Sequence, residues 1–237
     1  MALYVIGDLH LSLSGSKPMD IFGQQWKNHA EKLQENFLPL TDSDTTVLCG
    51  DLSWGMNFED SLADFRFVDQ LPGRKILLKG NHDYWWTTMK KMKEFLSANG
   101  LSTIDILNNN FFPYEENGAQ YAICGTRGWF FEEETGSPHD RQILLREVGR
   151  LKASLDAAAA AGIRNRLVFL HYPPLYAGYR CGEILDLLKE NEIRRCFYGH
   201  IHSKAIAGAF NGWRDGTEFR LISSDFLNFK PEKITLF

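Results

Sequence analysis

The sequence predicts a layered α/β fold with a sheet inside and helices outside. Short runs rich in β-branched and aromatic residues recur along the chain, and their near-continuous hydrophobicity predicts strands covered on both faces. Patterns of helical period separate the early runs, and the chain finishes as strands. Because the 237 residues are 44% hydrophobic, they can bury a sizeable core, and we expect residues 1–237 to form a single domain.

The strands are expected in an early and a late set. The early strands, each short and apolar, are residues 3–6, 45–49, 75–79, 120–124, 166–170 and 194–198. The late strands are residues 204–210, 218–224 and 233–237, and the turn-rich stretch NGWRDG lies between the first two.

The clearest helix signal lies in the middle of the chain. Ser137 precedes Pro138, and Asp140 follows three residues after the serine, which is a capping-box arrangement with proline in the first turn. The apolar face is marked by Leu144, Val148, Leu151 and Leu155, and Gly162 can end the helix. Further helices are expected at 20–36, 58–70, 86–98 and 182–190.

Charge and cysteine usage narrow the functional class. The net charge of −4 argues against a protein that grips long nucleic acid through a basic face. The four cysteines have no CxxC spacing, which indicates reduced thiols and not a disulfide or zinc framework. We expect no signal peptide and no membrane span, hence a cytoplasmic protein with no membrane partner, and the oligomeric state stays open.

Five of the expected strands end in polar groups that can bind metal ions. The blocks are GDLH at 7–10, GD at 50–51, GNHD at 80–83, HYPP at 171–174 and GHIH at 199–202. A single block of this kind is more often turn chemistry, but five together are improbable as coincidence. Ligand sites in α/β sheets gather beyond the carboxyl ends of strands, so we expect the blocks to converge.

The blocks offer seven candidate ligands of oxygen and imidazole type and no thiolate. They are Asp8, His10, Asp51, Asn81, His171, His200 and His202. Seven are too many for one ordinary ion, whereas two ions about 3.5 to 4 Å apart can share a carboxylate and clamp a phosphoryl group. The sequence therefore indicates two divalent transition-metal ions, manganese, iron, zinc or nickel, and an anionic phosphoester substrate.

In this order the blocks resemble the calcineurin-like metallophosphoesterases, across residues 7–202. The resemblance implies a four-layer sandwich of two mixed β-sheets flanked by α-helices, with a dinuclear centre at one end. It implies that Asp51 bridges the ions and that His82 is the catalytic histidine, an acid or transition-state stabiliser beside a metal-bridging hydroxide. One ion would be held by Asp8, His10 and His202, and the other by Asn81, His171 and His200.

Two departures from related branches matter. The chain reads GDLSWG and GNHD, whereas the protein phosphatases of the superfamily carry GDxxDRG and GNHE. Trp54 stands where purple acid phosphatases place a tyrosine ligand. The sequence therefore resembles the bacterial phosphodiesterase-like branch. The group that orients His82 is left open, and Asp83 is expected to support the loop and not to bind metal.

Three residues near the polar blocks are candidates for contact with the substrate. Trp54 and Trp85 neighbour the polar blocks and are candidates for a wall against a flat group, although ordinary core packing is the commoner role of any single such ring. Arg127 is a candidate for pairing with phosphate oxygens, with a solvated surface charge as the alternative.

Taken together, the motifs predict a metal-dependent phosphoester hydrolase, a phosphodiesterase acting on a small substrate. A phosphomonoesterase is the alternative enzyme. A non-catalytic protein-binding scaffold is the alternative of another class, and the intact set of His82 and seven ligands argues against it. A nuclease is weakened by the acidic charge balance and by the lack of a basic stripe.

Overall fold

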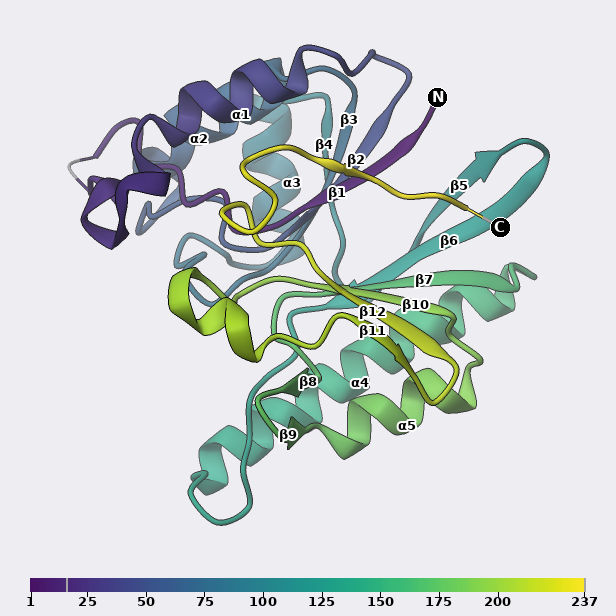
Figure 1. The fold of residues 1–237 in the computed structure, drawn as a ribbon. Helices are drawn as coiled ribbons and strands as arrows, with labels where there is room; N and C mark the ends of the chain where they lie inside the picture. Colours follow the sequence, from purple (N-terminus) through teal and green to yellow (C-terminus); the bar gives the residue numbers. More distant parts are fainter. Residues whose placement is uncertain (16, 237) are drawn as a thin grey trace.

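The computed structural model describes residues 1–15 and 17–236. Two sheets pack against each other, and helices cover the outer face of each (Figure 1). This arrangement confirms the predicted α/β fold of two mixed β-sheets flanked by α-helices. Within the described part of the chain, none of the helices is at once long and apolar enough to cross a bilayer.

The first sheet has the strand order β13-β1-β2-β3-β4. Its four parallel strands alternate with helices, and β13 runs antiparallel to β1 at the edge. The strands are β1 Leu3–Ile6, β2 Thr45–Cys49, β3 Arg74–Leu78, β4 Ile104–Ile106 and β13 Glu232–Lys233. The helices of this half are α1 His29–Phe37, α2 Phe58–Gln70 and α3 Met89–Ala98.

The second sheet has the order β11-β12-β10-β7-β6-β5, with parallel strands inside and antiparallel pairs at both edges. The strands are β5 Phe112–Glu116, β6 Ala119–Thr126, β7 Asn165–Leu170, β10 Arg195–Tyr198, β11 Gly212–Arg214 and β12 Thr217–Leu221. The helices are α4 Pro138–Ala160 and α5 Gly182–Glu190. A small hairpin joins β8 Leu175–Tyr176 to β9 Tyr179–Arg180. Three 3-10 turns complete the elements: η1 Met19–Phe22, η2 Gln24–Trp26 and η3 Ser203–Gly208.

Three apolar clusters hold the layers together. The middle cluster lies between the sheets, where Phe169 of β7 stacks on Phe197 of β10 and both pack in one cluster with Val47 of β2. The outer clusters join each sheet to its own helices. Because both faces of the inner strands are buried, their hydrophobic pattern is nearly continuous and not alternating.

Helix α4 begins as its sequence predicts. The Ser137 hydroxyl accepts a hydrogen bond from the Asp140 amide at 3.1 Å, and the Asp140 carboxylate accepts one from the Ser137 amide at 3.3 Å. These two bonds satisfy amides that have no partner within the first turn, which fixes the start of the helix. The helix ends at Ala160, and Gly162 follows in the left-handed region with φ of 79°.

The predicted strand at 204–210 is wrong, because this segment forms the 3-10 turn η3. Ser203 adopts a left-handed backbone with φ of 54°, and its amide donates to Asp225 Oδ2 at 2.8 Å. The contact with Asp225 turns the chain away from the sheet directly after the GHIH block.

Three further predictions need correction. The single helix expected at 20–36 is broken, because Gly23 at φ of 134° and Asn28 at φ of 54° interrupt it, and only α1 is α-helical. The strand expected at 233–237 shrinks to β13, and residue 237 lies outside the described residues. The stretch 211–216, expected as a turn only, also contains β11.

Candidate metal centre

The predicted ligands lie on the loops that follow β1, β2, β3, β7 and β10. In the first sheet Ile6 pairs with Leu48, and Leu48 pairs with Leu77, so the three strands end at one level. In the second sheet Leu170 pairs with Tyr198 in the same way. Since parallel strands place their carboxyl ends at one edge, all five loops meet there, as expected from the sequence.

The loops approach one another closely, which requires glycine at two positions. A Cβ atom on Gly80 would collide with the carboxylate of Asp51, and one on Gly199 would collide with the carboxylate of Asp8. The glycines of GNHD and GHIH therefore let two strand ends from different sheets approach the two aspartates.

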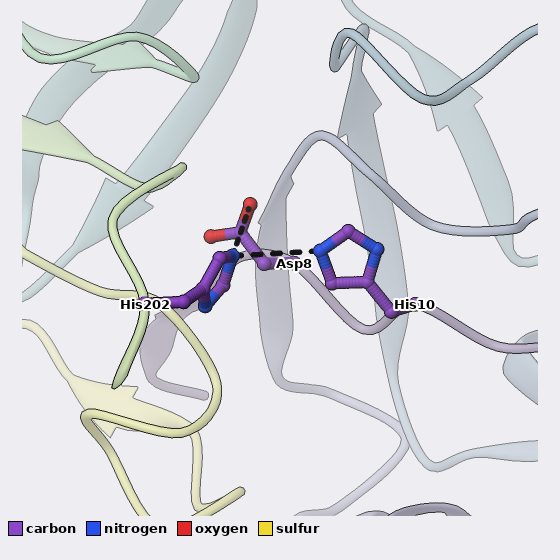
Figure 2. A group of neighbouring side chains, drawn as sticks. All are labelled: Asp8, His10 and His202. Carbon is purple, nitrogen blue, oxygen red and sulfur yellow. Dashed lines mark hydrogen bonds and ion pairs between the residues drawn. The ribbon is translucent and has the colours of Figure 1, made fainter. Parts of the chain in front are cut away.

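The first group of possible ligands consists of Asp8, His10 and His202, and their ligand atoms all lie within 4.8 Å of one another. Figure 2 shows the three side chains pointing toward a common point, Asp8 and His10 from the loop after β1 and His202 from the loop after β10. His202 Nε2 is 3.4 Å from His10 Nε2 and 3.6 Å from Asp8 Oδ1. Both nitrogens and the oxygen are atoms that bind divalent cations.

The second group consists of Asp51, His171 and His200, again within 4.8 Å. His171 Nε2 lies 3.2 Å from His200 Nδ1 and 2.6 Å from Asn81 Oδ1, so the asparagine belongs to the same cluster. All seven residues that the sequence predicted as ligands thus lie in two adjoining groups.

Asp51 lies between the two groups. Its Oδ2 atom is 3.7 Å from His10 Nε2 of the first group and 3.5 Å from His171 Nε2 of the second. One carboxylate oxygen therefore faces ligand atoms of both groups, which is the position that a bridging ligand would need.

Hydrogen bonds on the far side of two histidines fix their tautomers. His171 Nδ1 lies 3.1 Å from the carbonyl oxygen of Cys49, and His202 Nδ1 lies 2.8 Å from Asp225 Oδ1. In the neutral ring a proton on Nδ1 leaves a lone pair on Nε2, and the Nε2 atoms of both histidines face the ligand groups. This is the usual arrangement behind metal-binding histidines.

The electrostatics of the buried groups fit cations. Burial, and then the charge of Asp8, raise the pKa of Asp51 to about 8, so two buried carboxylates here repel each other. Burial lowers the pKa of His200 to about 3, which keeps its imidazole in the neutral, metal-binding form. For His202 burial opposes the charged form, but Asp8 and then Asp225 raise its pKa to about 10. The carboxylates of Asp8 and Asp225 thus favour a positive charge at the position of His202.

Asp83 supports the loops and does not join either ligand group, as expected. Its Oδ2 accepts hydrogen bonds from the amides of Asp51 at 3.0 Å and Gly80 at 2.7 Å. Its Oδ1 accepts from the Leu52 amide at 2.9 Å and from Trp85 Nε1 at 3.1 Å. The buried carboxylate therefore ties the loop after β2 to the loop after β3.

Asp225 is a functional candidate that the sequence analysis missed. Its side chain is 2% exposed, and it holds both His202 Nδ1 and the amide of Ser203. A polar Ser-Ser-Asp run, residues 223–225, closes the expected strand 218–224 and was the signal that could have found it. Asp225 is not placed to react with the substrate. Its carboxylate orients His202, which is a possible metal ligand.

His82 lies beside the ligand groups, and its amide donates to Asp51 Oδ1 at 2.7 Å. The Trp54 ring is 4.3 Å from the imidazole, and Tyr84 Oη is 3.2 Å from His82 Nδ1. Burial, and then the charge of His171, lower the pKa of His82 to about 4, so the ring is neutral near pH 7. A tyrosine hydroxyl that donates to Nδ1 leaves the ring proton on Nε2.

The three predicted substrate contacts lie in different surroundings. Trp54 stacks on His10 with ring centroids 5.1 Å apart, and Lys17 Nζ, which the sequence analysis missed, lies 4.3 Å above its ring. Trp85 is 3% exposed in the core between the first sheet and its helices. Arg127 forms an ion pair with Glu147 at 3.1 Å, and its guanidinium covers Trp129. Only Trp54 is therefore brought against a predicted ligand and His82.

The family model for calcineurin-like phosphoesterases matches residues 1–204, and the chain belongs to this family. Membership supports a hydrolase that cleaves phosphoester bonds with the help of metal ions. The family is dinuclear, and the two ligand groups found here provide two candidate sites for ions.

Comparison with solved structures shows the same fold in other chains. A phosphopantetheinyl hydrolase from Mycobacterium tuberculosis is 14% identical, with a TM-score of 0.64 over 98% of this chain and 95% of that one. A protein from Thermus thermophilus is 14% identical, with a TM-score of 0.58 over 98% and 97%. A protein of unknown function from Aquifex aeolicus is 18% identical, with a TM-score of 0.51 over 98% and 95%. No curated protein matches the sequence significantly.

Proposed function

We propose that the chain is a dinuclear-metal-dependent phosphodiesterase that acts on a small substrate. The observation that carries this proposal is the position of Asp51 Oδ2, which faces His10 of one ligand group and His171 of the other. Next to this shared carboxylate lies a neutral histidine, His82, that belongs to neither group.

The donor set defines how two ions would be held. Asp8, His10 and His202 would bind the first ion, whereas Asn81, His171 and His200 would bind the second. Asp51 would contact both. Imidazole nitrogens with carboxylate and amide oxygens suit manganese, iron, zinc or nickel. Bound ions would neutralise the phosphoryl oxygens and make a water molecule more acidic.

His82 is proposed to stabilise the leaving oxygen. A Tyr84 hydroxyl that donates to Nδ1 would leave the ring proton on Nε2, where it is available as a donor. A water oxygen bonds to phosphorus, the bond from phosphorus to the leaving oxygen breaks, and His82 donates a hydrogen bond to that oxygen. Solvent supplies the proton that completes the alcohol.

The proposed preference for a diester over a monoester rests on the cationic side chain and the cavity that lie near His82. Arg127 is already paired with Glu147, so Lys17 is the cation that we propose for contact with phosphate oxygens. One lysine suits the single charge of a diester better than the double charge of a monoester. A cavity of about 180 Å³ lined by Lys17 and Trp54 would hold a small leaving group.

We also keep three broader expectations as proposals. Residues 1–237 form one domain, because a single cluster packs between both sheets. The four cysteines are buried and free, which fits a reducing compartment such as the cytoplasm. The substrate is not a long nucleic acid, since the net charge is −4.

Trp85 is assigned to support of the loop through Asp83, and not to substrate contact.

The test compares the hydrolysis of a phosphodiester with that of a phosphomonoester that carries the same leaving group. Protein reconstituted separately with manganese, iron, zinc and nickel is assayed with bis(para-nitrophenyl) phosphate and with para-nitrophenyl phosphate. We expect the larger kcat/KM for the diester with at least one of the metals. A larger value for the monoester throughout would favour the phosphomonoesterase. Turnover that is unchanged in His82→Ala would contradict the assigned site.

A further inference from the structure

A second cavity, of about 400 Å³, lies beside the ligand group that contains His200. Its wall is built mainly of aromatic rings, contributed by Phe130, Phe131, Tyr176 and Tyr179. The segment that carries the two phenylalanines precedes α4, and the two tyrosines come from the β8–β9 hairpin. Four rings around one cavity make a surface suited to a flat or apolar group.

The aromatic wall is continuous with the candidate metal centre. The Phe130 ring meets the His200 imidazole edge-on, with centroids 5.8 Å apart, and it also contacts Tyr179 at 4.9 Å. Tyr172 lies 4.2 Å from His200 and 5.3 Å from Phe130. A group attached to a phosphate at the centre can therefore reach the cavity along one run of rings.

Both tyrosine hydroxyls are already engaged. Tyr179 Oη accepts a hydrogen bond from the Phe131 amide at 3.1 Å, and Tyr176 Oη donates to the Ala205 carbonyl oxygen at 3.2 Å. These bonds hold the rings in place and turn their polar atoms to the protein. The cavity also carries the carboxylates of Glu132 and Asp140 in its lining, which would repel a second phosphate group.

The cavity and the proposed leaving-group site lie beside different ligand groups. Trp54 stacks on His10 of the first group and lies next to His82, whereas Phe130 packs on His200 of the second. A phosphodiester has two arms, and the arm that leaves must face His82. The second arm is then directed to the side of His200.

We propose that the aromatic cavity binds the arm of the phosphodiester that stays on phosphorus, and that this arm is a flat or apolar group without a second phosphate. The inference rests on the proposed phosphodiesterase function. In the reaction a water oxygen bonds to phosphorus and the bond to the leaving arm breaks. The departing oxygen gains a proton from solvent. The product is a phosphomonoester whose remaining arm lies among Phe130, Tyr176 and Tyr179.

The first measurement compares two substrates with the same leaving group. Methyl para-nitrophenyl phosphate and phenyl para-nitrophenyl phosphate differ only in the retained arm. We expect kcat/KM for the phenyl compound to be at least about tenfold higher after correction for the uncatalysed rates, because a ring buries far more apolar surface than a methyl group. A ratio below about twofold would overturn the proposal.

A matched pair of variants locates the effect in the cavity. Thr135 lines the cavity, whereas Glu134 is the exposed neighbour on the same loop outside the lining. Thr135→Trp should fill the cavity, reduce the preference for the phenyl arm to about twofold or less, and leave the methyl compound within about twofold of wild type. Glu134→Trp should keep the wild-type preference. Equal preference in both variants and in wild type would place the discrimination elsewhere and refute the assignment.

Binding of the products separates this inference from the proposed function. Calorimetry of the manganese-loaded protein is carried out with phenyl phosphate and with methyl phosphate, neither of which needs turnover. We expect phenyl phosphate to bind at least about tenfold more tightly, and Thr135→Trp to remove the difference. If this holds while neither diester is hydrolysed, the subsite stands and the phosphodiesterase proposal fails. Equal binding of both products in the wild-type protein would refute the subsite whatever the enzyme cleaves.

Discussion

Replacing Asp83 with asparagine should destabilise the protein more than any comparable surface change. Asp83 Oδ2 serves the amides of Asp51 and Gly80, and Oδ1 serves the Leu52 amide and Trp85 Nε1. An asparagine has one acceptor oxygen, so in either orientation two buried N–H groups face its NH₂ group. Each buried donor without an acceptor costs about 1 to 3 kcal/mol, which gives a loss of about 2 to 6 kcal/mol.

One opposing effect sets where in this range the loss should fall. Burial, and then the charge of Asp51, raise the pKa of Asp83 to about 7, so the charge itself is costly in the metal-free protein. Asparagine removes that repulsion, and we expect the lower half of the range without metal. Even this loss is a large part of the total stability of a typical domain.

The assay is urea unfolding of the metal-free protein at neutral pH, followed by metal analysis after reconstitution. Asp156→Asn is the matched control, because this carboxylate is 60% exposed and pairs only with Lys152 on the surface of α4. The control should lose about 0.5 kcal/mol or less. If Asp83→Asn loses no more than the control and binds metal normally, the four hydrogen bonds do not hold the two loops together.

Four further changes test the centre itself. His82→Ala should lower kcat by a factor of about 10² to 10⁴ at unchanged metal content, whereas His171→Ala should lose an ion and recover part of its activity in excess manganese. A defect of His82→Ala that disappears with added metal would contradict its catalytic role. Asp51→Asn should weaken both ions together in a metal titration, and selective loss of one ion would exclude the bridging position. Asp225→Asn should lower the affinity for one ion about 10- to 100-fold, measured by competition with a chelator, and an unchanged affinity would leave Asp225 with a structural role only.

The parts of the fold that could be predicted are those with local signals. The predicted ranges 45–49 and 58–70 agree with β2 and α2, where β-branched residues and a helix cap act within a few residues. The ligand blocks could also be predicted from the sequence, because each follows directly after a buried strand. The strands β4, β5, β8 and β9 were missed. Three of them, β4, β8 and β9, have only two or three residues, which give no periodic signal.

The errors arose where a distant contact decides the local structure. Residues 204–210 alternate small and apolar groups and resemble a strand, yet Asp225 holds the amide of Ser203 and starts a 3-10 turn instead. The helix predicted at 20–36 failed differently, since Gly23 and Asn28 take backbone conformations that a periodic pattern does not reveal.

The two tryptophans after the ligand blocks show why contacts to substrate are harder to predict than ligands. Trp54 and Trp85 stand at similar distances from a predicted ligand in the sequence. The ring of Trp54 stacks on His10 and reaches His82, whereas Trp85 donates to Asp83 and packs edge-on against Phe65 of α2. The difference depends on which side of each loop faces the core. The residues next to each tryptophan in the sequence do not indicate which side that is.

The support of the centre follows the same logic and explains why Asp225 escaped the motif, whereas Asp83 stands inside the GNHD block. A ligand must sit at the end of its own strand, so its position is encoded in a short block. A supporting carboxylate has only to reach the loop from anywhere in the fold. Asp83 therefore holds Asp51 across 32 residues of sequence, and Asp225 holds His202 across 23. Asp83 joins the loops after β2 and β3, and Asp225 joins the segment after β12 to the loop after β10, so we expect their loss to loosen the ligand groups without removing a single ligand.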